Sequence, residues 1–283
     1  MGTETEAASN APPQIRRVPF LGVEITALGV REAAELIAAR PLGAPFAYVV
    51  TPNAAHFTRL GELKDARFAD AYAHAWLRLL DGATPRRLAK LVFGLDIPQA
   101  AGSDVASYLF AHCVRPGDTL TVIGGSEEMR RRLIDQYQLA AVNLFIPSMG
   151  FINRPEEVEA CVDYVVAHPA RYVFFVVGAP SSEYLARMVD ARGGAVGTGM
   201  CVGSALNFVT GIVERAPAFY REHGLEWLHR LWLNPTGHAR RVFVDSMPVL
   251  WMVAKARLDP DAYGMGAKAR ESTARGDGAG GAP

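Results

Sequence analysis

Apolar and polar positions alternate along the chain in blocks that predict strands and helices in turn. Short apolar runs bounded by turn residues predict buried strands; they lie at 46–50, 77–82, 119–123, 142–146, 172–177 and 195–203, with a further short strand near 17–23. Between the runs, apolar residues at helical spacing predict helices; these cover 30–37, 54–72, 104–112, 127–138, 155–167 and the residues from Pro180 to Met188. Residues 204–210 are expected to turn the chain onward.

This order of strand, loop and helix, with strands that are apolar throughout, is typical of a parallel sheet covered by helices on both faces. We therefore predict an α/β, Rossmann-like fold over residues 16–217. Residues 1–15 and 264–283 are small, polar and rich in Gly, Ala or Pro, which predicts disordered tails. Residues 218–263 differ in texture and are predicted to form a helical appendage.

The predicted appendage mixes tryptophans with cations. It holds Trp227, Trp232 and Trp251, with Arg and Lys residues between them. Helices of this composition can lie in a membrane interface. The alternative is an appendage that packs its tryptophans on the core. No run approaches the ~20 apolar residues that would cross a bilayer, so we expect a protein that is soluble or lies on a membrane surface.

Charge and cysteine usage exclude several classes of function. Lys plus Arg and Asp plus Glu both number 29, which argues against nucleic acid as the main partner. The three cysteines lack a Cys-x-x-Cys spacing, which fits a reducing cytoplasm and supplies no metal framework. The N-terminus lacks the basic and apolar regions of a signal peptide.

Candidate chemistry gathers where two predicted strands end. Thr51 and Asn53 flank Pro52 after the first strand, and Asp81 closes the second. In an open parallel sheet the carboxyl ends of the strands share the edge where ligands bind. We therefore expect these side chains at one binding edge. The alternative for Asp81-Gly82 is ordinary turn or helix-cap chemistry.

Other polar motifs are weaker signals. Gly124-Gly125, between a strand and a helix, would let backbone N–H groups approach a diphosphate, but glycines also serve plain turns. The chain has neither the Gly-x-Gly-x-x-Gly fingerprint nor a Walker lysine, so a generic Rossmann oxidoreductase ranks last. Glu183 is expected to bind a sugar hydroxyl or to begin a helix favourably. His56 is expected to be a surface or packed histidine, and no metal-ligand spacing is present.

Several fragments resemble the WecG/TagA/CpsF glycosyltransferases of bacterial surface polysaccharide synthesis, in the family's order over about residues 18–244. The fragments are Thr51-Pro52-Asn53-Ala54-Ala55-His56, Leu80-Asp81-Gly82, Gly102-Ser103-Asp104, Ile123-Gly124-Gly125, Gly150-Phe151, Gly178-Ala179-Pro180, Glu214-Arg215-Ala216-Pro217 and the run Gly224-Leu225-Glu226-Trp227-Leu228-His229-Arg230-Leu231.

The resemblance implies a metal-independent, inverting transfer of a sugar from a UDP-sugar to a polyprenyl-diphosphate-linked saccharide. It implies an enzyme without a cofactor on the cytoplasmic face of the bacterial plasma membrane, whose relatives can form homo-oligomers. It also implies Asp81 as general base. The expected donor-binding residues are Thr51, Asn53, Gly124, Gly125, Gly150, Gly178, Pro180, Ser182, Glu183 and Asn207. The candidates for contact with the lipid diphosphate of the acceptor are Arg215, Arg230, Arg240 and Arg241.

The chain departs from the family pattern at several positions. Gln99-Ala100-Ala101 replaces Glu-Arg-Val, Ser182 replaces Gln, and Asn207 replaces Asp. An expected Arg after Asn234-Pro235 reads Gly237 or is displaced to Arg240. These changes indicate either a different donor and acceptor or lost catalysis. The second reading is a family member that binds nucleotide or lipid-linked sugar and scaffolds a membrane assembly.

Overall fold

Six parallel strands form the centre of the molecule. The computed structural model describes residues 15–63, 65–217, 220, 228, 232, 244 and 246–266. The strands are β3 (Ala47–Val50), β4 (Leu77–Arg78), β5 (Thr119–Gly124), β6 (Ala141–Phe145), β7 (Tyr172–Val176) and β8 (Thr198–Cys201). They are ordered β4-β3-β8-β7-β5-β6, and every neighbouring pair is parallel. The predicted α/β class is confirmed.

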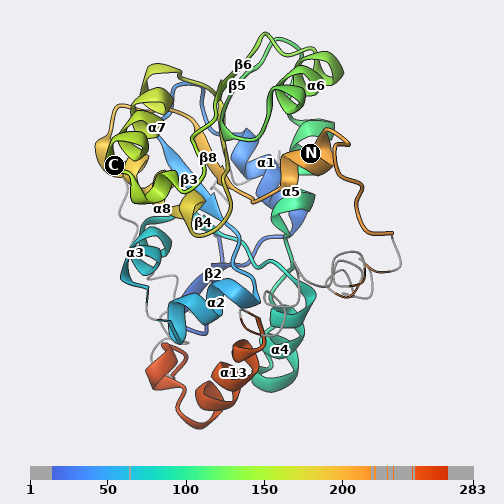
Figure 1. The fold of residues 1–283 in the computed structure, drawn as a ribbon. Helices are drawn as coiled ribbons and strands as arrows, with labels where there is room; N and C mark the ends of the chain where they lie inside the picture. Colours follow the sequence, from blue (N-terminus) through green and yellow to red (C-terminus); the bar gives the residue numbers. More distant parts are fainter. Residues whose placement is uncertain are drawn as a thin grey trace, which may run out of the picture.

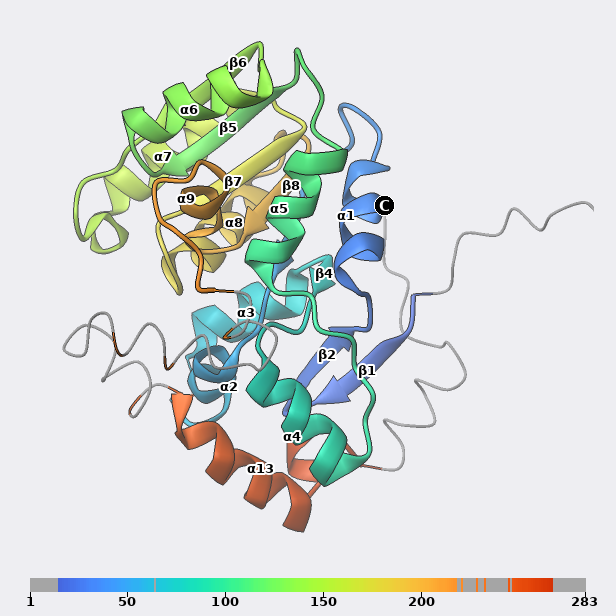
Figure 2. The ribbon, with the colours of Figure 1, turned by 90° about the vertical axis from the view of Figure 1, so that its right-hand side faces the viewer.

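Helices cover both faces of the sheet (Figures 1 and 2). On one face lie α3 (Ala66–His74), α7 (Pro155–Ala167) and α8 (Ser181–Arg192). On the other face lie α1 (Val30–Ala38), α5 (Gly102–His112), α6 (Glu127–Tyr137) and the short α9 (Ala205–Val209). A single 3₁₀ turn, η1 (Phe151–Asn153), precedes α7.

The central strand β7 shows why the chain folds into these layers. Its side chains alternate between the two faces. Val173 and Phe175 join the cluster on the α8 side, whereas Tyr172 and Phe174 join the cluster on the α5 side. All four are buried. A strand buried on both faces must be apolar throughout, which is the pattern that the sequence shows.

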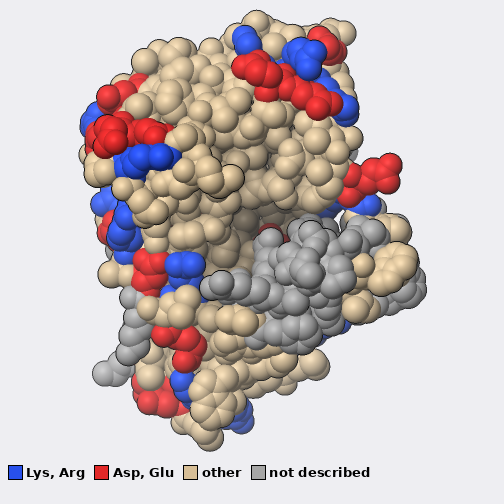
Figure 3. Space-filling view, viewed as in Figure 1, with Lys and Arg blue, Asp and Glu red and all other residues tan. Residues whose placement is uncertain are grey.

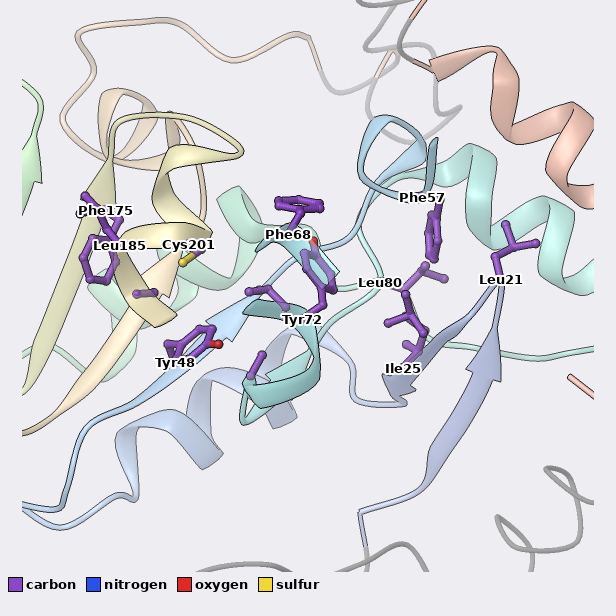
Figure 4. Packing of buried hydrophobic residues seen from close by; sticks show 14 of the residues in the cluster. Leu21, Ile25, Tyr48, Phe57, Phe68, Tyr72, Leu80, Phe175, Leu185 and Cys201 are labelled. Carbon is purple, nitrogen blue, oxygen red and sulfur yellow. The ribbon is translucent and has the colours of Figure 1, made fainter. Parts of the chain in front are cut away.

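A second group of elements packs beyond the β4 edge of the sheet, at the bottom of Figure 1. It comprises the hairpin β1 (Arg17–Phe20) and β2 (Val23–Thr26), the helices α2 (Ala54–Gly61), α4 (Ala83–Phe93) and α13 (Pro248–Leu258), and η3 (Asp261–Tyr263). Figure 4 shows its core, with Leu21, Ile25, Phe57 and Leu80, running into the sheet core through Tyr72. The two groups therefore share one continuous apolar cluster.

Helix α13 packs on this group through one stripe of side chains. Val249, Met252, Val253 and Ala256 are buried at helical spacing, and the helix contacts α2 and α4. Gly61 on α2 makes room for the Met252 side chain, because a methyl group there would lie 2.2 Å from Met252 Cε. About half of the predicted appendage, residues 218–263, lies outside the described residues, so its extent stays a prediction.

Two sequence predictions differ from the structure in the N-terminal half. The helix predicted over 54–72 is two helices, because Asp65 begins α3 by accepting the Phe68 N–H at 3.1 Å. The strand predicted near 17–23 is the first half of an antiparallel hairpin. Its turn at Leu21 and Gly22 has positive φ angles of 48° and 80°.

Three further differences concern short or polar segments. The strand predicted over 77–82 keeps ladder pairing only at Leu77–Arg78, after which the chain bends towards α4. Helix α4 was not predicted. Residues 204–210, predicted as a turn, include α9. Each element is either short or polar on its outer face, and in such segments tertiary contacts outweigh local periodicity.

Candidate functional site

The strand ends predicted to share an edge do lie together. Val50 and Arg78 are register partners in the β3–β4 pair. Just beyond them, the N–H of Asp81 donates to the carbonyl oxygen of Pro52 at 2.9 Å. This bond holds the two loops side by side, and Asp81 is half-buried there. The two strand ends therefore share one edge, as parallel topology predicts, and ligand binding at this edge stays a prediction.

The N-terminus of α5 lies against the same edge. The N–H of Gly102 lies 3.5 Å from Oδ2 of Asp81, at the outer limit of a hydrogen bond. A methyl group on Gly102 would lie 3.0 Å from Oγ1 of Thr51, so the helix end approaches both side chains. Helix N-termini carry a partial positive charge, which favours a carboxylate at this position. Sequence reasoning did not anticipate this contribution of α5.

Thr51 and Asn53 each make bonds that shape the edge. Thr51 is 4% exposed, and its hydroxyl donates to the carbonyl oxygen of Cys201 at 3.4 Å. Oδ1 of Asn53 accepts the N–H groups of Ala55 at 3.0 Å and His56 at 3.3 Å, which caps α2. The cap uses Oδ1 and does not engage the amide Nδ2. Asn53 therefore has a helix-capping role, and its role in donor binding stays a prediction.

Behind the edge lies a histidine–tyrosine pair. Nδ1 of His56 lies 2.7 Å from the Tyr72 hydroxyl, and the His56 ring packs edge-on against Phe68. Of the two expectations for His56, a surface or a packed histidine, these ring contacts favour the packed one. Burial raises the pKa of the Tyr72 phenol well above its ordinary value, and the nearby charges of Glu183 and other acidic groups add to this. Tyr72 therefore stays protonated.

Glu183 lies in the first turn of α8 and is 1% exposed. Burial raises the pKa of its carboxyl to about 7, against the opposing effects of a backbone hydrogen bond and the charge of Arg59. Among the described residues, its buried Oε2 has no hydrogen-bond partner. The neighbouring Ser182 is also buried, and its hydroxyl donates to the carbonyl oxygens of Phe175 and Gly178. That Ser182 and Glu183 bind the sugar donor stays a prediction.

The glycine loops follow β5, β6 and β7 at the carboxyl edge of the sheet. Gly124 has a φ of +92°, and a side chain there would collide with the Val176 carbonyl oxygen at 2.7 Å. Position 124 therefore requires glycine, because β7 approaches it closely. Gly150 and Gly178 stand in open loops with positive φ. The peptide bond before Pro180 is cis.

Arg215 reaches the N-terminal turn of α5 from the segment that follows α9. Its Nη2 bonds to Ser103 Oγ at 2.9 Å and to Asp104 Oδ1 at 2.7 Å. This turn also contains the Gly102 N–H near Asp81, so the guanidinium lies close to the candidate edge. Asn207 is half-buried on α9, which packs on α5. The other three predicted arginines, Arg230, Arg240 and Arg241, lie outside the described residues.

The surface of the molecule has a hollow. In Figure 3 the molecule is hollowed between the part built on the sheet and the part that holds α2 and α13. Most Lys, Arg, Asp and Glu side chains on the visible face gather away from the hollow.

Within the part of the chain that the structure describes, no group of three or more His, Cys, Asp or Glu side chains could hold a metal ion. No described helix is both long and apolar enough to cross a membrane.

A comparison with known protein families gives a match that covers most of the chain. The model of the "Glycosyl transferase WecG/TagA/CpsF family" matches residues 18–263. This chain belongs to that family. Membership makes it a glycosyltransferase of cell-surface glycan synthesis, which requires a sugar donor and an acceptor. The resemblance read from the motifs is thereby confirmed.

One departure from the family pattern has a packing explanation in this glycosyltransferase. Ala100 is fully buried, and its N–H donates to the Leu80 carbonyl oxygen at 2.9 Å. Ala101 is 9% exposed. An arginine at position 100 would need to bury its charge in the cluster beneath α5, which is costly without a partner. The site of this chain is therefore built around a small, neutral residue at that position.

Proposed function

We propose that this chain transfers a sugar from a UDP-sugar to a polyprenyl-diphosphate-linked saccharide, with inversion at the anomeric carbon and without a metal ion. The observation that carries the proposal is the Asp81 carboxylate, half-buried beside Thr51 and the α5 N-terminus. The product enters an exopolysaccharide, a capsule or a related surface glycan.

In the proposed reaction Asp81 is the general base. Its carboxylate accepts the proton of the acceptor hydroxyl while that oxygen forms a bond to the anomeric carbon of the donor. The bond between that carbon and the diphosphate oxygen breaks on the opposite face, and UDP leaves with the electron pair. General-base help of this kind contributes roughly 10²–10⁴-fold to the rate.

The charge of the departing diphosphate needs hydrogen-bond donors. The loops at Gly124-Gly125 and Gly178 offer backbone N–H groups at the carboxyl edge of the sheet, where anions bind readily. Arg215 supplies a cation near the α5 N-terminus. Charge-assisted hydrogen bonds from such groups are roughly twice as strong as neutral ones. We assign Arg230, Arg240 and Arg241 to the lipid diphosphate of the acceptor.

We place the enzyme on the cytoplasmic face of the plasma membrane, held peripherally. Support comes from α13, whose outer side carries Leu250, Trp251 and Leu258 at 43%, 62% and 87% exposure. Arg257 is exposed on the same helix, and Nζ of Lys255 lies 5.4 Å from the Trp251 ring centroid. Exposed aromatic and aliphatic side chains beside cations favour a lipid interface.

The test is an assay of transfer. Membranes that carry lipid-linked acceptor are incubated with the chain and a panel of UDP-sugars, and both UDP release and the extended lipid-linked product are measured. Asp81→Asn should remove turnover while UDP binding stays near normal. The control is Asp96→Asn, because Asp96 is an exposed carboxylate paired with Lys90. Turnover retained in Asp81→Asn would reject Asp81 as the base.

The replacements Ser182 and Asn207, together with the buried Ala100, favour a second candidate function. In it the chain binds nucleotide or lipid-linked sugar and scaffolds a membrane assembly without turnover. The same assay separates the two. Tight UDP binding, with no product from any UDP-sugar in the panel, would favour the scaffold.

A further inference from the structure

A cavity of about 640 Å³ lies between the β1–β2 hairpin, the end of α2, α3, β4 and η3. Its lining does not include Thr51, Asn53 or Asp81, so it is separate from the candidate edge. Its volume falls within the range of small-molecule sites, which is roughly 300–1,000 Å³. Such sites combine apolar walls with a few convergent polar groups, and this cavity has that composition.

Small and apolar side chains form much of the wall. Ala69 and Ala73, one turn apart on α3, are exposed and line the cavity. Leu60 at the end of α2 and Tyr263 in η3 line it as well. The N–H of Gly22 donates to the Tyr263 carbonyl oxygen at 2.9 Å, which ties the hairpin to the C-terminal element. The wall is thus assembled from segments far apart in the sequence.

Arg78 contributes the positive charge of the cavity. Arg78 is only 8% exposed. Its Nε and Nη2 donate to the carbonyl oxygens of Tyr72 and Ala73 in the last turn of α3. Cations are favourable at this helix end, so Arg78 has a structural role. A guanidinium carries five N–H donors, and these two bonds leave three. No carboxylate within the described ranges lies at ion-pair distance from Arg78.

Arg78 keeps donors beyond these two bonds and lines the cavity. Several arginines have a buried side-chain nitrogen without a hydrogen-bond partner among the described residues, but Arg78 has none. Since Nη1 of Arg78 has no hydrogen bond there either, that atom keeps contact with solvent space. Arg78 lines the cavity, so the cavity lies against one side of this residue.

Among the described residues that line the cavity, Arg78 is the cation and Glu24 is the carboxylate. Arg17 and Glu24 of the hairpin act on the Arg78 guanidinium with opposite signs. These two residues form a partly exposed ion pair at 3.5 Å, so their charges largely offset each other. A cation that is largely desolvated and lacks an anionic partner is costly. A bound anion would remove that cost.

We propose that this cavity binds an amphiphilic anion, a molecule with a single carboxylate or phosphate group on an apolar chain. The head group accepts hydrogen bonds from the Arg78 fork, whose geometry suits carboxylate and phosphate. The chain lies along Leu60, Ala69, Ala73 and Tyr263. The proposal concerns binding alone and does not depend on the transferase reaction.

The experiment is calorimetric titration of the full chain with decanoate, decyl phosphate and the neutral decanol. We expect both anions to bind with one site per chain and decanol to bind at least about tenfold more weakly, because a charge-assisted hydrogen bond is lost. The stronger of the two anions identifies the head group, carboxylate or phosphate. Failure of both anions to bind, or equal binding of decanol, overturns the proposal.

Two variants test the location. Ala73→Leu fills the cavity from an exposed helix position and should weaken decanoate binding roughly tenfold or more, whereas Ala167→Leu, on the exposed side of α7, should leave it unchanged. Arg78→Lys keeps the charge, loses the fork and should weaken binding too, with Arg31→Lys on α1 as its control. Circular dichroism checks that each variant folds. If Ala73→Leu binds decanoate as tightly as the parent, the assignment of the binding site to this cavity is overturned, even if Arg78→Lys does not fold.

Discussion

The buried carboxyl of Glu183 predicts an unusual dependence of stability on pH. In the unfolded chain this group titrates at its ordinary pKa of 4.5, whereas burial raises the pKa in the folded protein to about 7. Below pH 4.5 the carboxyl is protonated in both states and costs nothing. Between the two values the unfolded chain releases the proton and the folded protein keeps it, so the free energy of unfolding falls as pH rises.

The size of the effect follows from the gap between the two pKa values. Each pH unit is worth about 1.4 kcal/mol, so the folded protein loses about 3 kcal/mol once the pH exceeds 7. Glu183→Gln keeps the shape of the side chain and removes the titration. Relative to the parent, this variant should therefore gain about 2.5 kcal/mol in free energy of unfolding between pH 5 and pH 8.

Urea unfolding at pH 5, 6, 7 and 8 measures this difference, because the stability of each protein is extrapolated to water at every pH. Any fixed cost of placing an amide beside the unpartnered Oε2 position cancels in the comparison across pH. Glu156→Gln, an exposed change on α7, is the control and should run parallel to the parent. A constant difference between Glu183→Gln and the parent at all four pH values would refute the reasoning.

Substitutions at three further positions test individual contacts. Asn53→Ala should cost about 1 kcal/mol through loss of the α2 cap, whereas Asn53→Ser should restore most of it; thermal unfolding measures both. Gly124→Ala should lower stability by about 2 kcal/mol or more, because the residue has positive φ and the new methyl group meets the Val176 carbonyl oxygen; an unchanged melting temperature would contradict the packing argument. Met252→Ala should cost about 2–5 kcal/mol in urea unfolding, because its fully buried side chain fills the space over Gly61, and an effect below 1 kcal/mol would mean that α13 contributes little to the fold.

The sequence by itself determined the sheet and one part of the site. Strands buried on both faces must be apolar throughout, so β5 and β7 were readable as local runs. Parallel strands end on one side of the sheet, so Thr51 and Asp81 could be placed at a shared edge without coordinates. Both inferences need only information that is local to each segment, combined with one rule of topology.

The tertiary structure alone decided the features that depend on distant partners. Glu183 is a first-turn residue by sequence, and only the packing of α8 against α3 and the sheet buries it. The N-terminus of α5 approaches Asp81, which belongs to another segment of the chain. Arg215 contacts α5 although the two lie more than one hundred residues apart in the sequence. The cavity at Arg78 needs the hairpin and η3 to meet. Burial and proximity of this kind arise from long-range packing, which no local pattern encodes.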